Sequence, residues 1–187
     1  MLFTDTIFAL ATPYGCSGVA IFRVSGPHAS QIPELLKAGT CPPARHAARR
    51  KLFSTTKDDL IDDALLLFFQ APSSFTGEDV LEIHCHGSIA VLREVLAVLG
   101  QLPGLRLAEP GEFTRRAFLN GKLDLMEAEG LSDLIASETS LQKRQAWEIF
   151  GGKVSSFYES LRSNIVQTLA LLEATIDFSD EDIPTNL

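Results

Sequence analysis

A short alternating segment carries the residues of this sequence that are best suited to chemistry. After a turn-rich stretch at residues 72–77, the segment Val80–His86 alternates apolar and polar residues in the manner of a half-buried strand. Successive side chains of a strand point to opposite faces. One face would hold Leu81, Ile83 and Cys85, and the other would hold Val80, Glu82, His84 and His86. The segment therefore predicts one core face and one face with titratable groups.

Three interpretations fit this polar face. It can be a partly solvated face of an edge strand with no specific role. It can be a metal site, because His and Glu are competent ligands, although Glu-x-His-x-His is a loose spacing. It can also recognise a small molecule, because a fixed carboxylate accepts two hydrogen bonds from a planar edge such as that of guanine or a pterin. The spacing alone does not choose among them.

Arg23 is the second candidate, because it interrupts an otherwise apolar predicted strand at Val19–Ser25. On strand parity it points the same way as Val19 and Ile21. It is therefore either an edge residue that reaches water with its charged end, or a cation directed into a pocket.

Length and charge limit the function classes. The 187 residues are 45% hydrophobic, which is enough for a sizeable core, and the formal net charge is −8. Residues 1–118 hold 11 Lys and Arg against 12 Asp and Glu, whereas residues 119–187 hold 5 against 12. An excess of seven negative charges argues against direct binding of a nucleic-acid backbone by the second part.

Cysteine usage and hydropathy indicate the compartment. Cys16, Cys41 and Cys85 are odd in number and lack the spacing of a metal finger or a disulfide framework, so their roles stay open and a reducing cytoplasm is expected. The apolar start at residues 2–11 is too short to span a bilayer, and no basic residues precede it. We expect neither export nor a membrane partner.

The first part of the chain mixes strands and helices without a strict alternation, so the expected fold class is α+β. Turn residues and alternation predict strands at 6–11, 19–25, 52–55, 64–70, 80–86 and 106–108, and helices near 30–38, 88–100 and 111–120. The stretch at residues 40–50 is predicted to be a connection, and Arg45, Arg49, Arg50 and Lys51 are predicted to form a solvated basic cluster.

The second part of the chain, residues 119–187, is predicted to be all helical. Asp124 with Glu127, and Thr139 with Gln142, have the spacing of capping pairs and predict two helices, at about 124–136 and 139–176. Apolar residues recur at steps of three and four from Trp147 to Ile176, which predicts a long packing surface. We expect a domain at 1–118 and the first part of a helical domain at 119–187.

Gly151–Ser155 superficially resembles a phosphate-binding loop. The pattern requires a glycine where Trp147 stands and a Ser or Thr where Val154 stands. The sequence therefore assigns no nucleotide site.

Several stretches together resemble a known family. They are the motifs DTI at 5–7, ATPYG at 11–15, GVAIFRVSG at 18–26, SFTGEDVLE at 74–82, HG at 86–87, PGEFTRRAFLNGKLDL at 110–125, EAE at 127–129, DLI at 133–135 and ATIDF at 174–178. In this order they are similar to the N-terminal region and the first part of the helical domain of the bacterial tRNA-modification GTPases MnmE (TrmE).

The resemblance implies a fold and a ligand. It implies that residues 1–118 form a domain similar to the folate domains of aminomethyltransferases, which dimerises and binds 5-formyl- or 5,10-methylene-tetrahydrofolate. At the matching positions, Arg23, Glu82 and Lys122 would contact the folate. The folate would supply one carbon for a wobble uridine of tRNA, in a complex with the flavoprotein MnmG (GidA).

The resemblance also limits the activity expected of this chain. The family's GTPase domain, with its GTP, Mg²⁺ and K⁺, would follow Phe178, and the sequence holds no such domain. We therefore expect the chain to lack catalysis on its own. Two alternatives stay open: a stand-alone metal-dependent enzyme using Glu82, His84 and His86, and a dimerisation scaffold with a vestigial pocket.

Overall fold

The computed structural model describes residues 3–54 and 59–177. The chain forms two compact units, which divide between Leu123 and Asp124. The sequence predicts a division after residue 118, but residues 119–123 belong with the first unit. The amide of Lys122 donates to the carbonyl of Ala117, and the Asn120 side chain donates to the carbonyl of Thr76. Predictions for residue 2, for Thr55 and for residues 178–187 lie outside the described residues.

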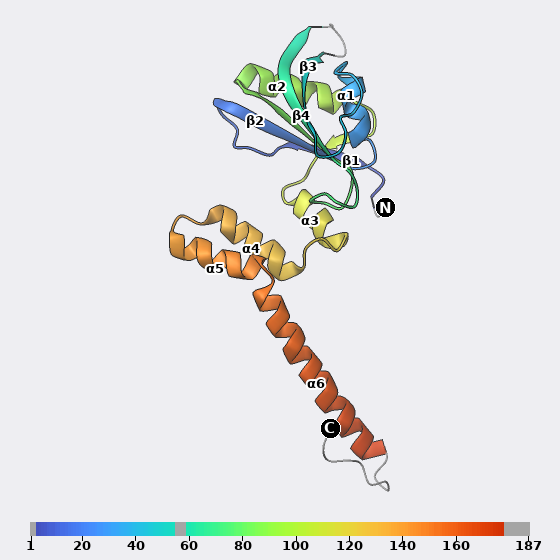
Figure 1. Cartoon of the computed structure of the whole chain (residues 1–187), viewed down its shortest axis with the longest axis vertical. Coiled ribbons are helices and arrows are strands. Elements are labelled where there is room, and N and C mark those ends of the chain that lie inside the picture. Colours follow the sequence, from blue (N-terminus) through green and yellow to red (C-terminus); the bar gives the residue numbers. More distant parts are fainter. Residues whose placement is uncertain (1–2, 55–58, 178–187) are drawn as a thin grey trace. The chain divides into compact units, whose positions relative to one another are not determined.

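The first unit is built on one six-stranded sheet with the order β3-β4-β5-β2-β1-β6 (Figure 1). Neighbouring strands are antiparallel, except that β1 and β6 are parallel. The strands are β1 Thr6–Leu10, β2 Ser17–Ser25, β3 Ala47–Phe53, β4 Leu60–Phe69, β5 Val80–Gly87 and β6 Leu105–Leu107. This architecture, joined to a helical unit, confirms the α+β class.

Strand β3 corrects a sequence prediction. Residues 47–50 were expected within a connection, yet they pair with β4 from Ala47 opposite Leu67 onward. Their local sequence, Ala-Ala-Arg-Arg, has no strand pattern. Pairing with the neighbouring strand therefore decides their conformation, because strand preference depends strongly on tertiary context.

One face of the sheet carries the core. It packs against the helices α1 (Ile32–Leu35), which follows the short 3₁₀ turn η1 (Ala29–Gln31), and α2 (Ile89–Gln101). The core includes Phe22, Leu66, Ile83, Leu92 and Leu99, none of them exposed. The predicted core face of β5 is confirmed, because Leu81, Ile83 and Cys85 are all buried. Within the described ranges, no helix is long and apolar enough to cross a membrane.

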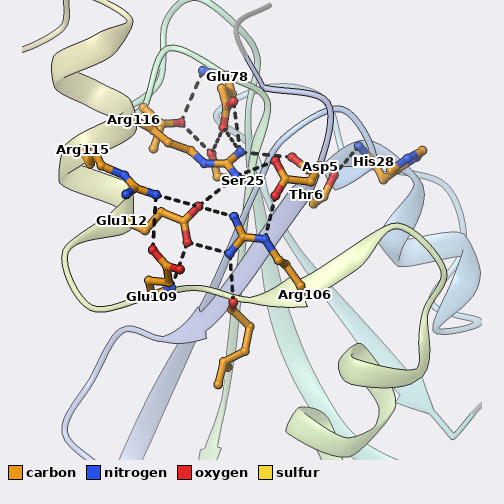
Figure 2. Close-up of polar contacts among 12 residues, drawn as sticks. Asp5, Thr6, Ser25, His28, Glu78, Arg106, Glu109, Glu112, Arg115 and Arg116 are labelled. Atoms are coloured by element: carbon orange, nitrogen blue, oxygen red, sulfur yellow. Dashed lines mark hydrogen bonds and ion pairs between the residues drawn. The ribbon is translucent and has the colours of Figure 1, made fainter.

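Helix α3 (Glu112–Leu119) is anchored by a buried arginine (Figure 2). The Arg116 side chain is fully buried. Its Nη1 donates to both carboxylate oxygens of Glu78 at 3.2 Å and to the carbonyl of Asp5 at 3.1 Å. Its Nη2 donates to Asp5 Oδ1 at 2.8 Å and to Glu112 Oε1 at 3.1 Å. One guanidinium thus joins the start of the chain, the loop before β5 and α3.

A second arginine completes this buried ion cluster, which we define as Asp5, Glu78, Arg106, Glu112 and Arg116. From β6, Arg106 donates to Asp5 Oδ2 at 2.7 Å and to both oxygens of Glu112. Hydrogen bonds from Arg106, which outweigh burial, lower the pKa of Glu112 from 4.5 to about 2. Burial would raise the pKa of Asp5, but the two arginines hold it below its usual value.

The second unit consists of helices α4 (Leu125–Ala136), α5 (Ser140–Phe150) and α6 (Lys153–Asp177). Both predicted capping boxes are present, at Asp124 with Glu127 and at Thr139 with Gln142. The predicted single helix over 139–176 is wrong. Gly152 has a φ of +76°, a left-handed conformation that ends α5 and lets α6 begin in a new direction.

The predicted apolar stripe of the second unit is largely exposed. No described residue of α6 is buried, and Phe157 and Ile176 are 64% and 67% exposed. Helices α4 and α5 instead meet closely at Gly130, where a Cβ atom would lie 2.6 Å from the amide nitrogen of Phe150. The stripe is therefore an unpartnered surface, and Gly130 sets the packing of the helical pair.

We expect the first unit to lose stability in acid through Glu112. Because its pKa is lower in the fold than in the unfolded chain, its contribution is complete above pH 4.5 and is lost as the pH falls toward 2. The difference from 4.5 to about 2 corresponds to about 3 kcal/mol. Hydrogen exchange of β5 amides, corrected for intrinsic rates, measures this free energy. A Glu112→Gln variant should be less stable at pH 7 and show a shallower pH dependence; identical slopes for both proteins would contradict the assignment.

Gly130→Ala should destabilise the helical unit by about 1–3 kcal/mol, because the added methyl group meets backbone atoms of α5. Urea unfolding followed by the fluorescence of Trp147, the single tryptophan, reports on this unit. Gly100→Ala in α2 is the matched control, since its Cβ would lie 3.8 Å from Phe8, an ordinary contact. The Trp147 transition should move in the first variant and stay in the second. An unmoved transition in Gly130→Ala would show that the two helices separate at no cost.

Candidate functional site

Arg23 and Glu82 form an ion pair on the sheet face opposite the core. They lie opposite each other on β2 and β5. Arg23 donates to Glu82 Oε1 from Nε at 3.0 Å and from Nη2 at 2.7 Å, with the two side chains 29% and 14% exposed. The second carboxylate oxygen, Oε2, lies 3.4 Å from His84 Nε2. Arg23 is therefore directed across the sheet rather than out to water, and Oε2 keeps capacity to accept hydrogen bonds.

Two aromatic rings flank this pair. The Arg23 guanidinium carbon lies 5.4 Å from the centre of the Phe75 ring and 5.9 Å from that of Phe113, which are cation–π distances. Phe75 belongs to the loop before β5, and Phe113 to α3. These are two of the segments that Arg116 joins, so the buried ion cluster sets the position of both rings.

Lys122 lies near the same loop but does not join the ion pair. An ideal Cβ at Gly77, whose φ is +77°, would lie 3.3 Å from Cγ and Cε of Lys122. The side chain therefore runs along Gly77, two residues from Phe75. Within residues 3–54 and 59–177, no hydrogen bond or ion pair links the Lys122 ammonium to Arg23 or Glu82. The structure thus brings Arg23 and Glu82, two of the three predicted contact residues, together and places the third, Lys122, beside the loop that carries Phe75 and Gly77.

The three polar side chains of β5 do not converge on one point. His84 turns toward Glu82, whereas His86 turns to β4, where its amide and Nδ1 lie 2.6 and 2.7 Å from the Asp62 carboxylate. Burial would raise the pKa of Asp62, but these hydrogen bonds hold it below its usual value. Among the described residues no group of three His, Cys, Asp or Glu side chains is arranged to hold a metal ion. The metal-site alternative has no support from this geometry.

A pocket of about 290 Å³ opens on the same face beside His84. It is lined by Gly18, Val19, Arg49, Asp63, Ala64, Leu65, His84, Cys85 and His86.

Burial raises the pKa of the Cys85 thiol to about 11, so this cysteine stays protonated and unreactive. Cys16 is exposed and Cys41 half-buried, and all three cysteines are free thiols.

The residues that hold the site in place were not singled out from the sequence. Glu112 and Arg116 fall in the helix predicted near 111–120, and Glu78 lies between the predicted turn and the predicted strand. One signal was available, because Glu112 and Arg116 stand four residues apart, which puts them on one helix face. No feature of the neighbouring sequence predicts that Glu112 and Arg116 are buried. The partners of Arg116, Glu78 and Asp5, lie 38 and 111 residues away in the sequence.

Comparisons with known proteins identify the family of the chain. Residues 6–122 match the family model described as GTP-binding protein TrmE N-terminus, and residues 125–186 match the model described as MnmE helical domain. Three curated relatives carry the name tRNA modification GTPase MnmE. The chain is 51% identical to the one from Cereibacter sphaeroides, 49% to that from Rickettsia bellii and 52% to that from Rhodospirillum rubrum.

These alignments cover nearly all of the chain but less than half of each relative. They include 98%, 98% and 96% of the chain, and 42%, 41% and 42% of the three relatives in the same order. One family model alone accounts for residues 6–122, and a second follows directly in the order found in the sequence. The chain therefore belongs to the MnmE family of tRNA modification GTPases and matches the N-terminal region and helical domain of that family.

Proposed function

We propose that this chain is the folate-binding and dimerisation module of a GTPase that modifies the wobble uridine of tRNA. The observation that carries the proposal is the half-buried Arg23–Glu82 pair, flanked by Phe75 and Phe113 on the sheet face opposite the core. A charged pair held between aromatic rings is suited to a flat, polar heterocycle. The pair also lies at the positions where the resemblance to the family predicts folate contacts.

The donor and acceptor pattern of the pair fits a pterin. Oε1 of Glu82 is occupied by Arg23, while Oε2 can accept from the ring N–H and the amino group of the pterin. Arg23 and the Lys122 ammonium can donate to carbonyl or formyl oxygens, since both side chains carry several donors. The bound folate, in its 5-formyl or 5,10-methylene form, supplies the one-carbon unit. The protein's part is to bind and orient it.

The activity of the whole protein goes beyond this module. The curated relatives are named tRNA modification GTPases, and the chain spans 42% of their length. The motif at Gly151–Ser155 lies at the junction of α5 and α6 and lacks the residues of a phosphate loop, so we expect no GTP binding here. We propose that GTP, Mg²⁺ and K⁺ act elsewhere in the parent protein, and that MnmG and tRNA meet the module in the cytoplasm.

A dimerisation scaffold without a working pocket is the second candidate. The exposed apolar stripe of α6 favours it, because such surfaces mark contacts with a partner. The scaffold needs no ligand at Arg23 and Glu82, so a folate titration separates it from the first proposal.

Replacing Glu82 or Arg23 should weaken folate binding and keep the fold. Calorimetry with 5-formyltetrahydrofolate should show a loss of about 1.5–3 kcal/mol for Glu82→Gln and for Arg23→Ala, which is about one to two decades in affinity. Glu82→Gln keeps the size of the side chain but replaces one acceptor with a donor. Arg93→Ala, an exposed arginine on α2, is the control and should bind normally. Unchanged affinity in both site variants, with normal circular dichroism, would remove these residues from the site.

We expect the chain to sediment as a homodimer at tens of micromolar protein. The contact between the two subunits should lie within residues 1–118. Phe157→Glu places a charge in the exposed stripe of α6 and should keep both the fold and the dimer, because Phe157 is 64% exposed. Equilibrium sedimentation of both proteins tests this. A monomeric wild-type chain would refute the dimer, and a dimer lost in Phe157→Glu would place the contact on α6 instead.

A further inference from the structure

The positive charge of the first unit is unevenly placed. Of the 11 Lys and Arg within residues 1–118, six lie within residues 35–57, a stretch that has no Asp or Glu. Four of the other five are held in ion pairs, namely Arg23, Arg106, Arg115 and Arg116. Residues 35–57 are therefore the part of the first unit with an excess of positive charge.

Strand β3 displays these cations at one edge of the sheet (Figure 1). Among the described residues it is the last strand in the sheet order, and it pairs with β4 alone. Because Leu52 is buried in the core, Arg50 lies on the core face of the sheet, whereas Arg49 and Lys51 lie on the opposite face. All three are exposed. Cations therefore project from both faces of this edge.

We define the basic edge as Arg45, Arg49, Arg50 and Lys51. Arg49 donates to Asp63 at 3.0 and 2.7 Å, but its side chain is 80% exposed. Arg45 and Arg50 each donate to a backbone carbonyl at 3.0 Å. Within the described part of the chain, no carboxylate forms an ion pair with Arg45, Arg50 or Lys51. Three of the four charges are therefore available to an anion.

The side chains along this strand favour a nucleic-acid backbone over a protein partner. Three of the four cations are arginines, whose planar guanidinium can donate two parallel hydrogen bonds to a phosphate. Their neighbours Ala47 and Ala48 are small and provide no aromatic or large aliphatic anchor of the kind that dominates protein interfaces. From Ala47 to Phe53 the strand is about 20 Å long, which is enough for several phosphates.

We propose that the basic edge binds the phosphate backbone of RNA. The choice of RNA rests on the proposed function, in which the chain belongs to a protein that modifies tRNA. The contact requires no particular base, because phosphates attract cations regardless of sequence. Residues 119–187 carry an excess of seven negative charges, so the RNA contact falls to the first unit. The basic edge thus positions the tRNA without reading its bases.

Binding of an unmodified tRNA transcript to the full chain tests the proposal. Fluorescence anisotropy at low salt should show saturable binding. A plot of log K against log salt should have a slope of about −3, because each of four phosphate contacts contributes about −0.7 to −0.9. The triple variant Arg45→Gln/Arg50→Gln/Lys51→Gln should bind about tenfold more weakly and lose about two units of that slope.

The control variant Arg93→Gln/Lys143→Gln/Arg144→Gln removes the same charge from exposed positions on α2 and α5. It should bind tRNA as the wild-type chain does. Equal weakening by the two triple variants would show that only net charge matters, which would overturn the basic edge.

Asp63→Asn gives an expected gain of affinity, which a misfolded variant would not produce. It removes the carboxylate that pairs with Arg49, so tRNA should bind about threefold more tightly at low salt. Asp133→Asn removes an exposed carboxylate from α4 and should leave the affinity unchanged. Unchanged or weaker binding by Asp63→Asn would contradict the proposal.

Three further outcomes separate the alternatives. Displacement of tRNA by polyglutamate at equal charge concentration would identify an acidic protein segment as the partner and overturn the RNA assignment. Normal tRNA binding by the first triple variant, together with self-association, would show that the cations only keep the edge from pairing. A chain that binds 5-formyltetrahydrofolate but no tRNA would overturn the basic edge alone, whereas one that binds tRNA but no folate would overturn the folate proposal alone.

Discussion

The structure of the first unit depends on the burial of one guanidinium. Arg116 is fully enclosed, and a charge in that position is tolerated only when opposite charges surround it. Asp5, Glu78 and Glu112 supply them, and Arg106 offsets part of the excess negative charge. Removing Glu78 or Glu112, which are buried against Arg116, would leave its charge poorly compensated, and breaking a buried ion pair typically costs about 3–5 kcal/mol. The cluster therefore fixes the relative positions of the segments that contribute to it.

Those segments are the ones that build the candidate site. The loop of Glu78 also carries Phe75 and Gly77, and the helix of Arg116 also carries Phe113 and leads into Lys122. Ser25 strengthens the link, since its hydroxyl donates to Glu78 Oε2 at 2.7 Å from the end of the strand that holds Arg23. The sheet thus provides a rigid base for the Arg23–Glu82 pair, and the buried ion cluster holds the aromatic residues over it. The residues that stabilise the first unit therefore also position the candidate site.

The two units bury their apolar side chains to different extents. The first unit encloses its core between one sheet face and the helices α1 and α2. The second unit buries Gly130 and Ala146 between α4 and α5 and leaves the stripe of α6 exposed. Burial of apolar surface contributes roughly 25 cal/mol per Å², so this stripe favours association with another apolar surface.

Features that depend on neighbouring residues in the chain could be predicted from the sequence. Alternation predicted the two faces of β5, side-chain spacing predicted both capping boxes, and the resemblance to the family singled out Arg23 and Glu82, which the fold brings into contact. Long-range contacts decided that residues 47–50 extend strand β3, and that His86 turns to Asp62 rather than to Glu82. They also decided the burial of Arg116. The physical reason is that periodicity and capping act over a few residues, whereas strand pairing and buried ion pairs join residues far apart, and their partners are known only once the chain has folded.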